Sequence, residues 1–130
     1  MTSMSTPIVD TGLVQLIDTY CAAWNEPDPS RRQSMLSSVW GQGATYTDPT
    51  VHAVGAEELL AHIGKVIARR PGAKVVRTSA VDAHHGLARF AWRIVQSDGS
   101  MLPEGIDFAE ISAQGKIQRI IGFFGPLAPL

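Results

Sequence analysis

The sequence predicts an α+β fold in which three N-terminal helices pack on one face of a strongly curved antiparallel β-sheet. Apolar residues recur at steps of three and four in three segments before Gly72, and they alternate with polar residues in almost everything that follows. Each helix and the sheet then has one apolar side to bury, which favours packing the helices against the sheet. A chain of 130 residues, 45% of them hydrophobic, is long enough to form one core, so a single domain over residues 1–130 is expected.

Three segments carry the apolar stripe of an amphipathic helix. The first is expected to begin near Asp10, and the second has a typical N-cap and first turn in Asp28 and Pro29. The sequence NEPDP ends the first helix, two glycines end the second, and Pro71-Gly72 ends the third. The stripes are Leu13, Ile17, Tyr20 and Trp24; then Met35, Leu36, Val39 and Trp40; then Leu59, Leu60, Ile63, Val66 and Ile67.

The remaining segments have the alternation of β-strands. GATYTDPTVHAVG, between the second and third helices, is expected to be a short strand that enters a turn at Pro49. After the third helix, turns at Gly86, SDG and AQGK separate four long stretches, which predict antiparallel strands. These stretches are AKVVRTSAVDAHH, LARFAWRIVQ, EGIDFAEIS and KIQRIIGFFG.

The composition argues against several classes of function. A formal net charge of −1 offers no broad positive surface to nucleic acid or to an anionic membrane. No apolar run approaches the roughly 20 residues of a membrane span, and the N-terminus lacks the charged and apolar regions of a signal peptide, so a cytoplasmic protein is expected. Neither the spacing of a metal site nor a glycine-rich phosphate loop is present, so we expect no metal and no organic cofactor. The single cysteine, Cys21, is expected to be a small core residue.

Asp48 lies at the end of the short strand, on the same face as Ala44 and Tyr46. Burying an unpaired carboxylate is costly, so its position on an apolar face needs an explanation. One interpretation is a turn residue, because Asp48-Pro49 is a common start of a turn and the side chain can accept a hydrogen bond from the following backbone. The other interpretation is a half-buried base beside a pocket.

Two further polar side chains interrupt apolar rows. Tyr20 lies on the stripe of the first helix, so its ring is expected to be buried with a hydroxyl that needs a partner. Asp107 shares one face of its strand with Gly105, Ala109 and Ile111. The alternatives are a core tyrosine bonded to a backbone carbonyl and an exposed sheet face that carries Asp107.

Three stretches, TYCAAWN, GATYTDPT and GIDFAEISAQGKIQRIIGFFG, together resemble the nuclear transport factor 2-like superfamily, in particular its SnoaL-like and ketosteroid isomerase-like branches. The resemblance extends from the first helix to Phe124. It implies a single SnoaL-like domain, in which three helices pack on a curved mixed or antiparallel sheet that forms a cone with an apolar pocket.

The resemblance also implies roles for three residues. Tyr20 in TYCAAWN matches the tyrosine that donates a hydrogen bond to the oxyanion of the ketosteroid isomerases, and Asp48 in ATYTDP matches their general base. Asp107 in GIDF matches their second oxyanion donor, an aspartate that an apolar site keeps protonated. All three interrupt apolar rows, as a raised pKa at Asp107 requires.

The leading hypothesis is therefore a steroid delta-isomerase-like enzyme that moves a proton next to the carbonyl of a small apolar ketone or polyketide-like molecule. A SnoaL-like aldol cyclase would use similar acid–base chemistry. Epoxide hydrolysis on this fold needs an arginine between two carboxylates, and the strand arginines are expected to face away from the pocket, so this reaction ranks lower. From another class, a non-catalytic ligand-binding or dimeric protein would leave Asp48 as a turn residue and bond Asp107 to Tyr20.

Four more residues are candidates for contact with a substrate. Phe90 and Trp92 share one strand face, and Phe123 shares another with Ile121, so either row is expected to wall an apolar cavity. His52, just after the turn, is expected to line the cavity mouth. The alternatives are core or dimer contacts for the aromatic residues and a loop position for His52.

The outer face of the sheet is expected to form a homodimer, because it leaves apolar residues outside a core that the helices already cover. These residues are Ala91, Val95, Ile106, Phe108 and Ile120.

Overall fold

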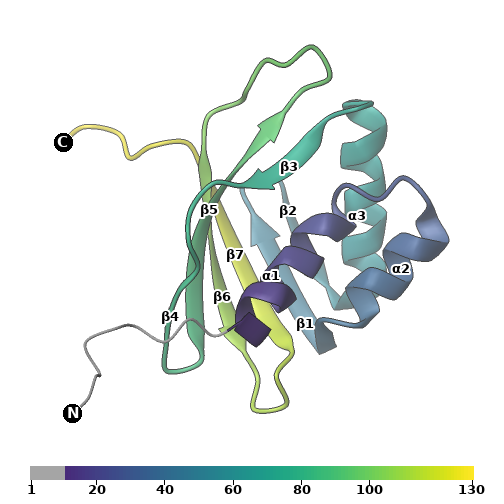
Figure 1. Ribbon diagram of the computed structural model, residues 1–130, viewed down its shortest axis with the longest axis vertical. Helices are drawn as coiled ribbons and strands as arrows, with labels where there is room; N and C mark the ends of the chain where they lie inside the picture. The colour runs from purple at the N-terminus through teal and green to yellow at the C-terminus, as the bar shows by residue number, and fades with distance from the viewer. Residues whose placement is uncertain (1–10) are drawn as a thin grey trace.

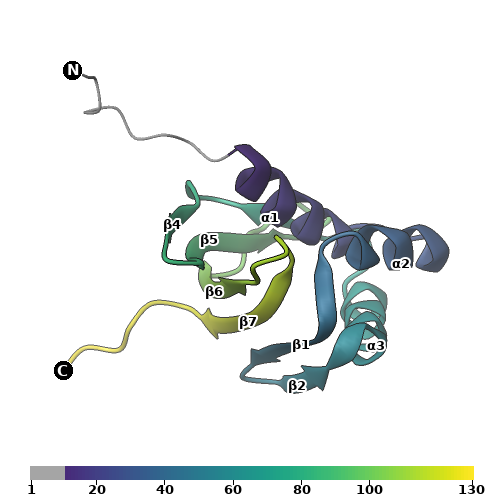
Figure 2. The ribbon, with the colours of Figure 1, turned by 90° about the horizontal axis from the view of Figure 1, so that it is seen from below.

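The three helices lie on one side of a strongly curved sheet, as expected for an α+β fold (Figures 1 and 2). The structure is a computed structural model and describes residues 11–130, so the expected helix start at Asp10 lies outside it. In the described part of the chain, no helix is long and apolar enough to cross a membrane. The helices are α1 (Thr11–Ala23), α2 (Pro29–Ser37) and α3 (Gly55–Arg69).

The sheet has seven strands and is mixed. Its order is β2-β1-β7-β6-β5-β3, and β4 lies off this path, paired with the first residues of β5. The β1–β7 pair is parallel, whereas all other pairs are antiparallel. The strands are β1 (Trp40–Asp48), β2 (Val51–Val54), β3 (Lys74–Arg77), β4 (Asp82–His84), β5 (Leu87–Val95), β6 (Gly105–Ile111) and β7 (Ile117–Phe124).

Asp28 caps α2 as expected, since its carboxylate accepts a hydrogen bond from the backbone N–H of Arg31. The expectation that Trp40 belongs to the second helix was wrong. The helix ends at Ser37, and Trp40 begins β1 by pairing with Ile117 of β7. The apolar stripe therefore continues past the end of the helix because the first residue of the next strand enters the same core.

The expected long strand after α3 is also divided, which corrects the prediction of four long strands. β3 pairs with the second half of β5 and β4 with the first half. Between them, the backbone N–H of Ala91 donates to the side-chain hydroxyl of Ser79, so a side chain takes the place of a strand partner at this point.

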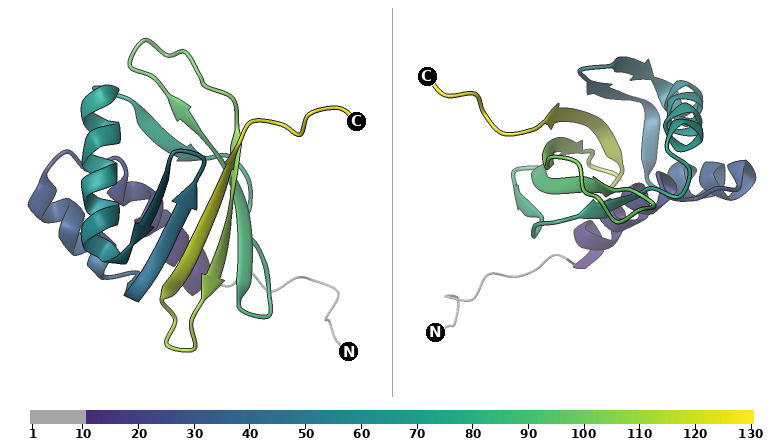
Figure 3. Two further views of the ribbon diagram at one scale, coloured as in Figure 1. Left: turned by 180° about the vertical axis from the view of Figure 1, so that it is seen from behind. Right: turned by 90° about the horizontal axis from the view of Figure 1, so that it is seen from above.

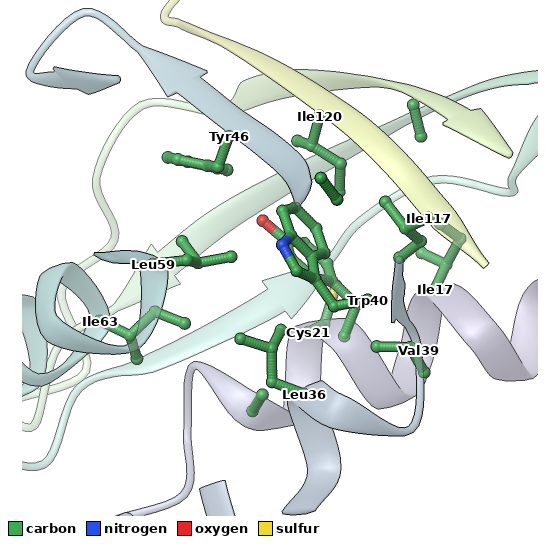
Figure 4. Close-up of a cluster of buried hydrophobic side chains, with 14 of the residues drawn as sticks. Ile17, Cys21, Leu36, Val39, Trp40, Tyr46, Leu59, Ile63, Ile117 and Ile120 are labelled. Atoms are coloured by element: carbon green, nitrogen blue, oxygen red, sulfur yellow. The ribbon is translucent and has the colours of Figure 1, made fainter. Parts of the chain in front are cut away.

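The core fills the end of the curved sheet where β1 and β7 begin (Figure 4). The indole of Trp40 lies among buried aliphatic side chains of α1, α2 and β7, and the ring of Tyr20 stacks on it with centroids 5.8 Å apart. Because the parallel strands β1 and β7 start together in this core, they also end together at the opposite end of the sheet (Figure 3).

Asn25, which follows α1 and ends the TYCAAWN stretch, holds the edge strand in place. Its side-chain amide donates to the carbonyl of Val75 at 2.9 Å and accepts from the Val75 N–H at 2.7 Å. These two bonds satisfy the backbone of β3 at the edge of the sheet and fix the strand against the end of α1. The asparagine of the TYCAAWN stretch therefore has a structural role, because it holds β3 in place.

Candidate active site

A cavity of about 450 Å³ opens at the end of the sheet where β1 and β7 finish. Its volume lies in the range of small-molecule sites. Most of its wall is apolar, and its charged and polar groups come from β1, β6 and the side chains that α1 and α3 turn toward it. The lining includes Tyr20, Trp24, Tyr46, Asp48, His62, Val66, Val75, Phe90, Trp92, Ile94, Leu102, Asp107 and Phe124.

The three polar residues singled out by the sequence, Tyr20, Asp48 and Asp107, all line this one cavity. They come from α1, β1 and β6, which are far apart in the chain. The expected gathering of a tyrosine and two carboxyls around an apolar space is therefore present in the fold.

The two oxygens of Asp48 have different surroundings. Oδ1 accepts hydrogen bonds from the backbone N–H and the hydroxyl of Thr50, both at 2.7 Å, which is the geometry of a turn aspartate. Oδ2 accepts a hydrogen bond from the Tyr46 hydroxyl at 2.6 Å. The side chain is only 3% exposed. Asp48 is thus held in the turn through one oxygen, and through the other it is bonded to Tyr46, a second residue that lines the cavity.

Asp107 is buried among apolar groups on the inner face of β6. The pKa of its carboxyl is raised from 3.8 to about 7, mainly by burial; the nearby Asp48 carboxylate contributes to the rise, whereas the hydrogen bond from Trp92 opposes it. The indole Nε1–H of Trp92 donates to Oδ1 at 2.9 Å. Oδ2 has no such donor among the described residues, so it is the oxygen on which a proton can sit and point to a ligand.

Gly122 of β7 explains how the two carboxyls approach the same space. Asp107 pairs with Gly122, and Thr47 pairs with Ile121, so the next residues of β1 and β7, Asp48 and Gly122, lie at the same level. A Cβ atom at Gly122 would lie 2.8 Å from Oδ1 of Asp107 and 3.6 Å from Cβ of Asp48. The absence of a side chain at Gly122 therefore leaves room for both acidic side chains beside β7.

Tyr20 is fixed by aromatic packing rather than by a hydrogen bond. Its ring stacks on Trp40 and meets the edge of Trp24 at 6.4 Å between centroids. Its buried hydroxyl oxygen has no hydrogen-bond partner among the described residues. Burial raises the pKa of this phenol and the negative charge of Asp107 raises it further, whereas the Trp24 side chain lowers it; the net rise means that the hydroxyl keeps its proton and can donate a hydrogen bond. The alternative in which Tyr20 bonds to Asp107 is not the arrangement found.

The structure places two of the four expected contact residues in the cavity. Phe90 and Trp92 line it from β5. His52 instead lies on the exposed side of β2, where it bonds to the hydroxyl of Thr47, because its neighbour Ala53 takes the inward position of the strand. Phe123 is 59% exposed on the outer face of β7, whereas the next residue, Phe124, lines the cavity.

Two cavity residues were not given a role by the sequence reasoning. Tyr46 donates to Asp48, and burial raises its pKa above the usual range for tyrosine. His62 of α3 places Nε2 3.9 Å from Oδ2 of Asp48. A usable signal for His62 is its helical spacing, because His62, Val66 and Arg69 follow one another at steps of four and three and all line the cavity.

The cavity mouth has a positive side. Arg69 and Arg70, at the end of α3, line it beside Val66, and the guanidinium of Arg70 donates to the side chain of Gln96. Within residues 11–130, no cluster of three or more histidine, cysteine or acidic side chains has the geometry of a metal site. No arginine of the described chain forms an ion pair with Asp48 or Asp107, so the arginine-bridged pair of carboxylates of an epoxide hydrolase is not formed.

Solved structures with this fold are similar over most of the chain. A proposed SnoaL-like polyketide cyclase from Jannaschia sp. CCS1 is 13% identical, with a TM-score of 0.72 over 93% of this chain and 90% of that one. A protein with a cystatin-like fold from Methylobium petroleophilum PM1 is 18% identical, with a TM-score of 0.73 over 95% and 82%. At these identities the likeness concerns the fold alone.

A protein from Agrobacterium tumefaciens strain C58, described as a proposed isomerase of the SnoaL-like family, is more similar. It is 30% identical, with a TM-score of 0.84, over 89% of this chain and 99% of its own. No family model matches the chain, and no curated protein is significantly similar to it. The identity and the nearly complete match to the Agrobacterium protein establish that the chain belongs to the SnoaL-like family of nuclear transport factor 2-like proteins.

Proposed function

We propose that the chain is an enzyme that removes a proton from the carbon next to the carbonyl of a small, mostly apolar ketone. The observation that carries the proposal is a pair of acidic residues, Asp48 and Asp107, which approach the same glycine, Gly122, and line one mostly apolar cavity. Asp107 is buried among apolar groups, whereas Asp48 accepts hydrogen bonds from Tyr46 and Thr50. Two carboxyls in such different environments are suited to separate acid and base roles.

Asp48 is the base in this proposal. Asp48 lines the cavity, and the bonds from Tyr46 and Thr50 hold its carboxylate in a fixed orientation. When Oδ2 takes the proton, the electron pair of the C–H bond moves into the carbonyl and leaves an enolate. A positioned base of this kind contributes about 100- to 10,000-fold to the rate.

Tyr20 and Asp107 stabilise the enolate oxygen. The Tyr20 hydroxyl is buried without a partner among the described residues, so a carbonyl oxygen of the substrate satisfies a donor that is otherwise unpaired there. With a pKa of about 7, a large fraction of Asp107 carries a proton at neutral pH and can donate it from Oδ2. Return of the proton to a second carbon completes an isomerisation, whereas attack of the enolate on a second carbonyl completes an aldol cyclisation.

The test is hydrogen–deuterium exchange at the carbon next to the carbonyl of 2-tetralone, a flat bicyclic ketone, followed by mass spectrometry in D2O. The chain should accelerate exchange over buffer, and Asp48→Asn should lose about 100-fold or more of that acceleration with its fold intact by circular dichroism. Asp98→Asn is the matched control, because Asp98 accepts from the N–H and hydroxyl of Ser100 in the same kind of turn but is fully exposed.

Two results would contradict the proposal. If Asp48→Asn exchanges 2-tetralone as fast as the original chain, Asp48 is the turn residue of the alternative interpretation. If 2-tetralone perturbs the NMR signals of cavity residues but does not exchange faster than in buffer, the cavity binds ligands without catalysis.

A further inference from the structure

His62 is the one imidazole that lines the cavity within the described chain, and it lies beside the proposed base. Nε2 is 3.9 Å from Oδ2 of Asp48, the oxygen that accepts the hydrogen bond from Tyr46, and all three residues line the cavity. This separation exceeds a hydrogen bond, but catalytic contacts of this kind are often long without substrate and shorten when it binds.

Packing fixes the position of the imidazole. The edge of its ring meets Trp24 with centroids 5.8 Å apart, and it lies against Tyr46 at 6.0 Å. Trp24, directly after α1, also contacts Tyr46 of β1, so the three rings pack against one another. The two aromatic rings hold the imidazole in place, as the residues around a functional side chain must.

The charged and titratable groups around His62 favour a neutral imidazole. Burial lowers its pKa from the ordinary value of 6.5, and Arg69 and Lys65 on the same helix lower it further, whereas Asp48 on β1 raises it. Tyr46 of β1 keeps its proton, and Trp24, which directly follows α1, is uncharged. At neutral pH the ring can therefore accept a proton.

Asp48 by itself is poorly placed to exchange a proton with water. Its side chain is 3% exposed, Oδ1 carries both bonds from Thr50, and a proton that arrives on Oδ2 shares that oxygen with the Tyr46 hydroxyl. The side chain of His62 is 12% exposed, and the exposed residues Arg69 and Arg70, which follow it along the chain, line the same cavity. The imidazole thus offers the carboxylate a route for its proton.

We propose that His62 is a second catalytic residue, which takes from Asp48 the proton removed from the substrate and passes it to water or to a second atom of the substrate. The inference rests on the proposed function and adds a step to it. The substrate C–H bond breaks, its electron pair enters the enolate, and an O–H bond forms at Oδ2. That O–H bond then breaks as an N–H bond forms at Nε2, which leaves a carboxylate beside an imidazolium.

The first experiment measures exchange of 2-tetralone by His62→Gln across pH 4 to 8. The exchange assay reports this step directly, because a proton that returns from Asp48 to the same carbon is not seen. Exchange by the original chain should fall at acid pH, below the ordinary histidine value of 6.5, as His62 becomes protonated. His62→Gln should lower exchange at neutral pH by about 100-fold and lower it less at acid pH, where His62 of the original chain is already protonated. His84→Gln, a matched change at an exposed histidine of β4, should alter neither the pH dependence of exchange nor its rate at neutral pH.

The second experiment does not depend on activity or on the fold of the His62 variant. NMR titration of His62 in Asp48→Asn should give a lower midpoint than in the original chain, because the variant lacks the carboxylate that raises the pKa of the imidazole.

The outcomes separate this inference from the proposed function. If the original chain exchanges 2-tetralone but His62→Gln stays within about threefold of it at every pH, His62 takes no part and the proposed function stands. An unchanged midpoint in Asp48→Asn likewise overturns the pairing. If the original chain gives no exchange above buffer, the proposed function fails and the inference fails with it.

Discussion

Replacement of Asp107 by asparagine should stabilise the protein at neutral pH, although Asp107 is a buried residue of the sheet. The folded protein raises the pKa of this carboxyl from 3.8 to about 7. As the pH rises, Asp107 therefore loses its proton at a lower pH in the unfolded chain than in the folded protein. The free energy of unfolding falls as a result between about pH 4 and pH 7. Asparagine has no proton to lose, so the variant escapes this loss.

The size of the effect follows from the shift. A change of about three pKa units corresponds to about 4 kcal/mol, at about 1.4 kcal/mol per unit. The asparagine of the variant would keep an oxygen to accept the Trp92 Nε1–H, so the hydrogen bond at this position does not have to be lost. Asp107→Asn should thus match the original chain near pH 4 and exceed its free energy of unfolding by about 4 kcal/mol at pH 8.

Urea unfolding, followed by tryptophan fluorescence at several pH values, measures this difference. Glu110→Gln is the matched control, because Glu110 lies on the opposite face of the same strand, half-exposed beside Arg119. An exposed pair contributes about 1 kcal/mol or less, so this variant should follow the original chain. If the advantage of Asp107→Asn does not grow between pH 4 and pH 8, Asp107 is ionised in the folded protein and is not an acid at neutral pH.

Further predictions concern the same cavity and the outer face of the sheet. Trp92→Phe should raise the pKa of Asp107 further, as seen by NMR of its carboxyl carbon, because it removes the donor that lowers this pKa; an unchanged value would mean that the indole bond does not form. Asp107→Ala should slow 2-tetralone exchange more than Asp107→Asn, since only the amide still donates a hydrogen bond to the enolate; equal rates would remove Asp107 from the reaction. Gly122→Ala should weaken 2-tetralone binding and lower stability by about 1–3 kcal/mol, because its Cβ would lie 2.8 Å from the Asp107 carboxyl; unchanged affinity would show that the room left at Gly122 is not needed. The chain should be a homodimer in light scattering, and Phe108→Glu with Phe123→Glu should make it a monomer, as these exposed rings contact each other on the outer face; a monomeric parent chain would refute this.

The polar residues of the cavity were predictable from the sequence because each interrupts an apolar row in a regular element. Alternation over GIDFAEI gives the inner face of β6 directly, so Asp107 is placed correctly. The period of the first helix places Tyr20 in the core in the same way. Local periodicity is sufficient wherever one side of an element is clearly apolar.

The faces of β7 could not be predicted in this way. The run from Ile120 to Phe124 is apolar apart from Gly122, so alternation does not select which side is buried. The register with β6 decides it: Phe123 lies opposite Ile106 on the outer face, and Ile120 lies opposite Ala109 in the core. The expectation that Phe123 walls the cavity and Ile120 faces outward was therefore wrong.

The contacts of His62 and Trp92 depend on tertiary packing. A single histidine in an amphipathic helix is typical of a solvated face, and His62 enters the cavity only because α3 packs against β1. Trp92 pairs with Gly105, two residues from Asp107, so its bond to the carboxyl is a diagonal contact between strands. A Cβ at Gly105 would lie 2.5 Å from the indole, so this glycine also makes room for the ring.

The free energy needed to bury Asp107 helps to distinguish a functional role of this residue from a structural one. About 4 kcal/mol is a large share of the roughly 5–15 kcal/mol by which domains are stable, and apolar burial must offset it. The apolar cluster around Trp40 lies at the other end of β1 and β7, so it can supply this stability without filling the cavity. If Asp107 were retained for structure, Asp107→Asn would make the protein less stable or leave it unchanged. A variant that is more stable at neutral pH and yet slower in exchange can be explained only by a carboxyl that is retained for its chemistry.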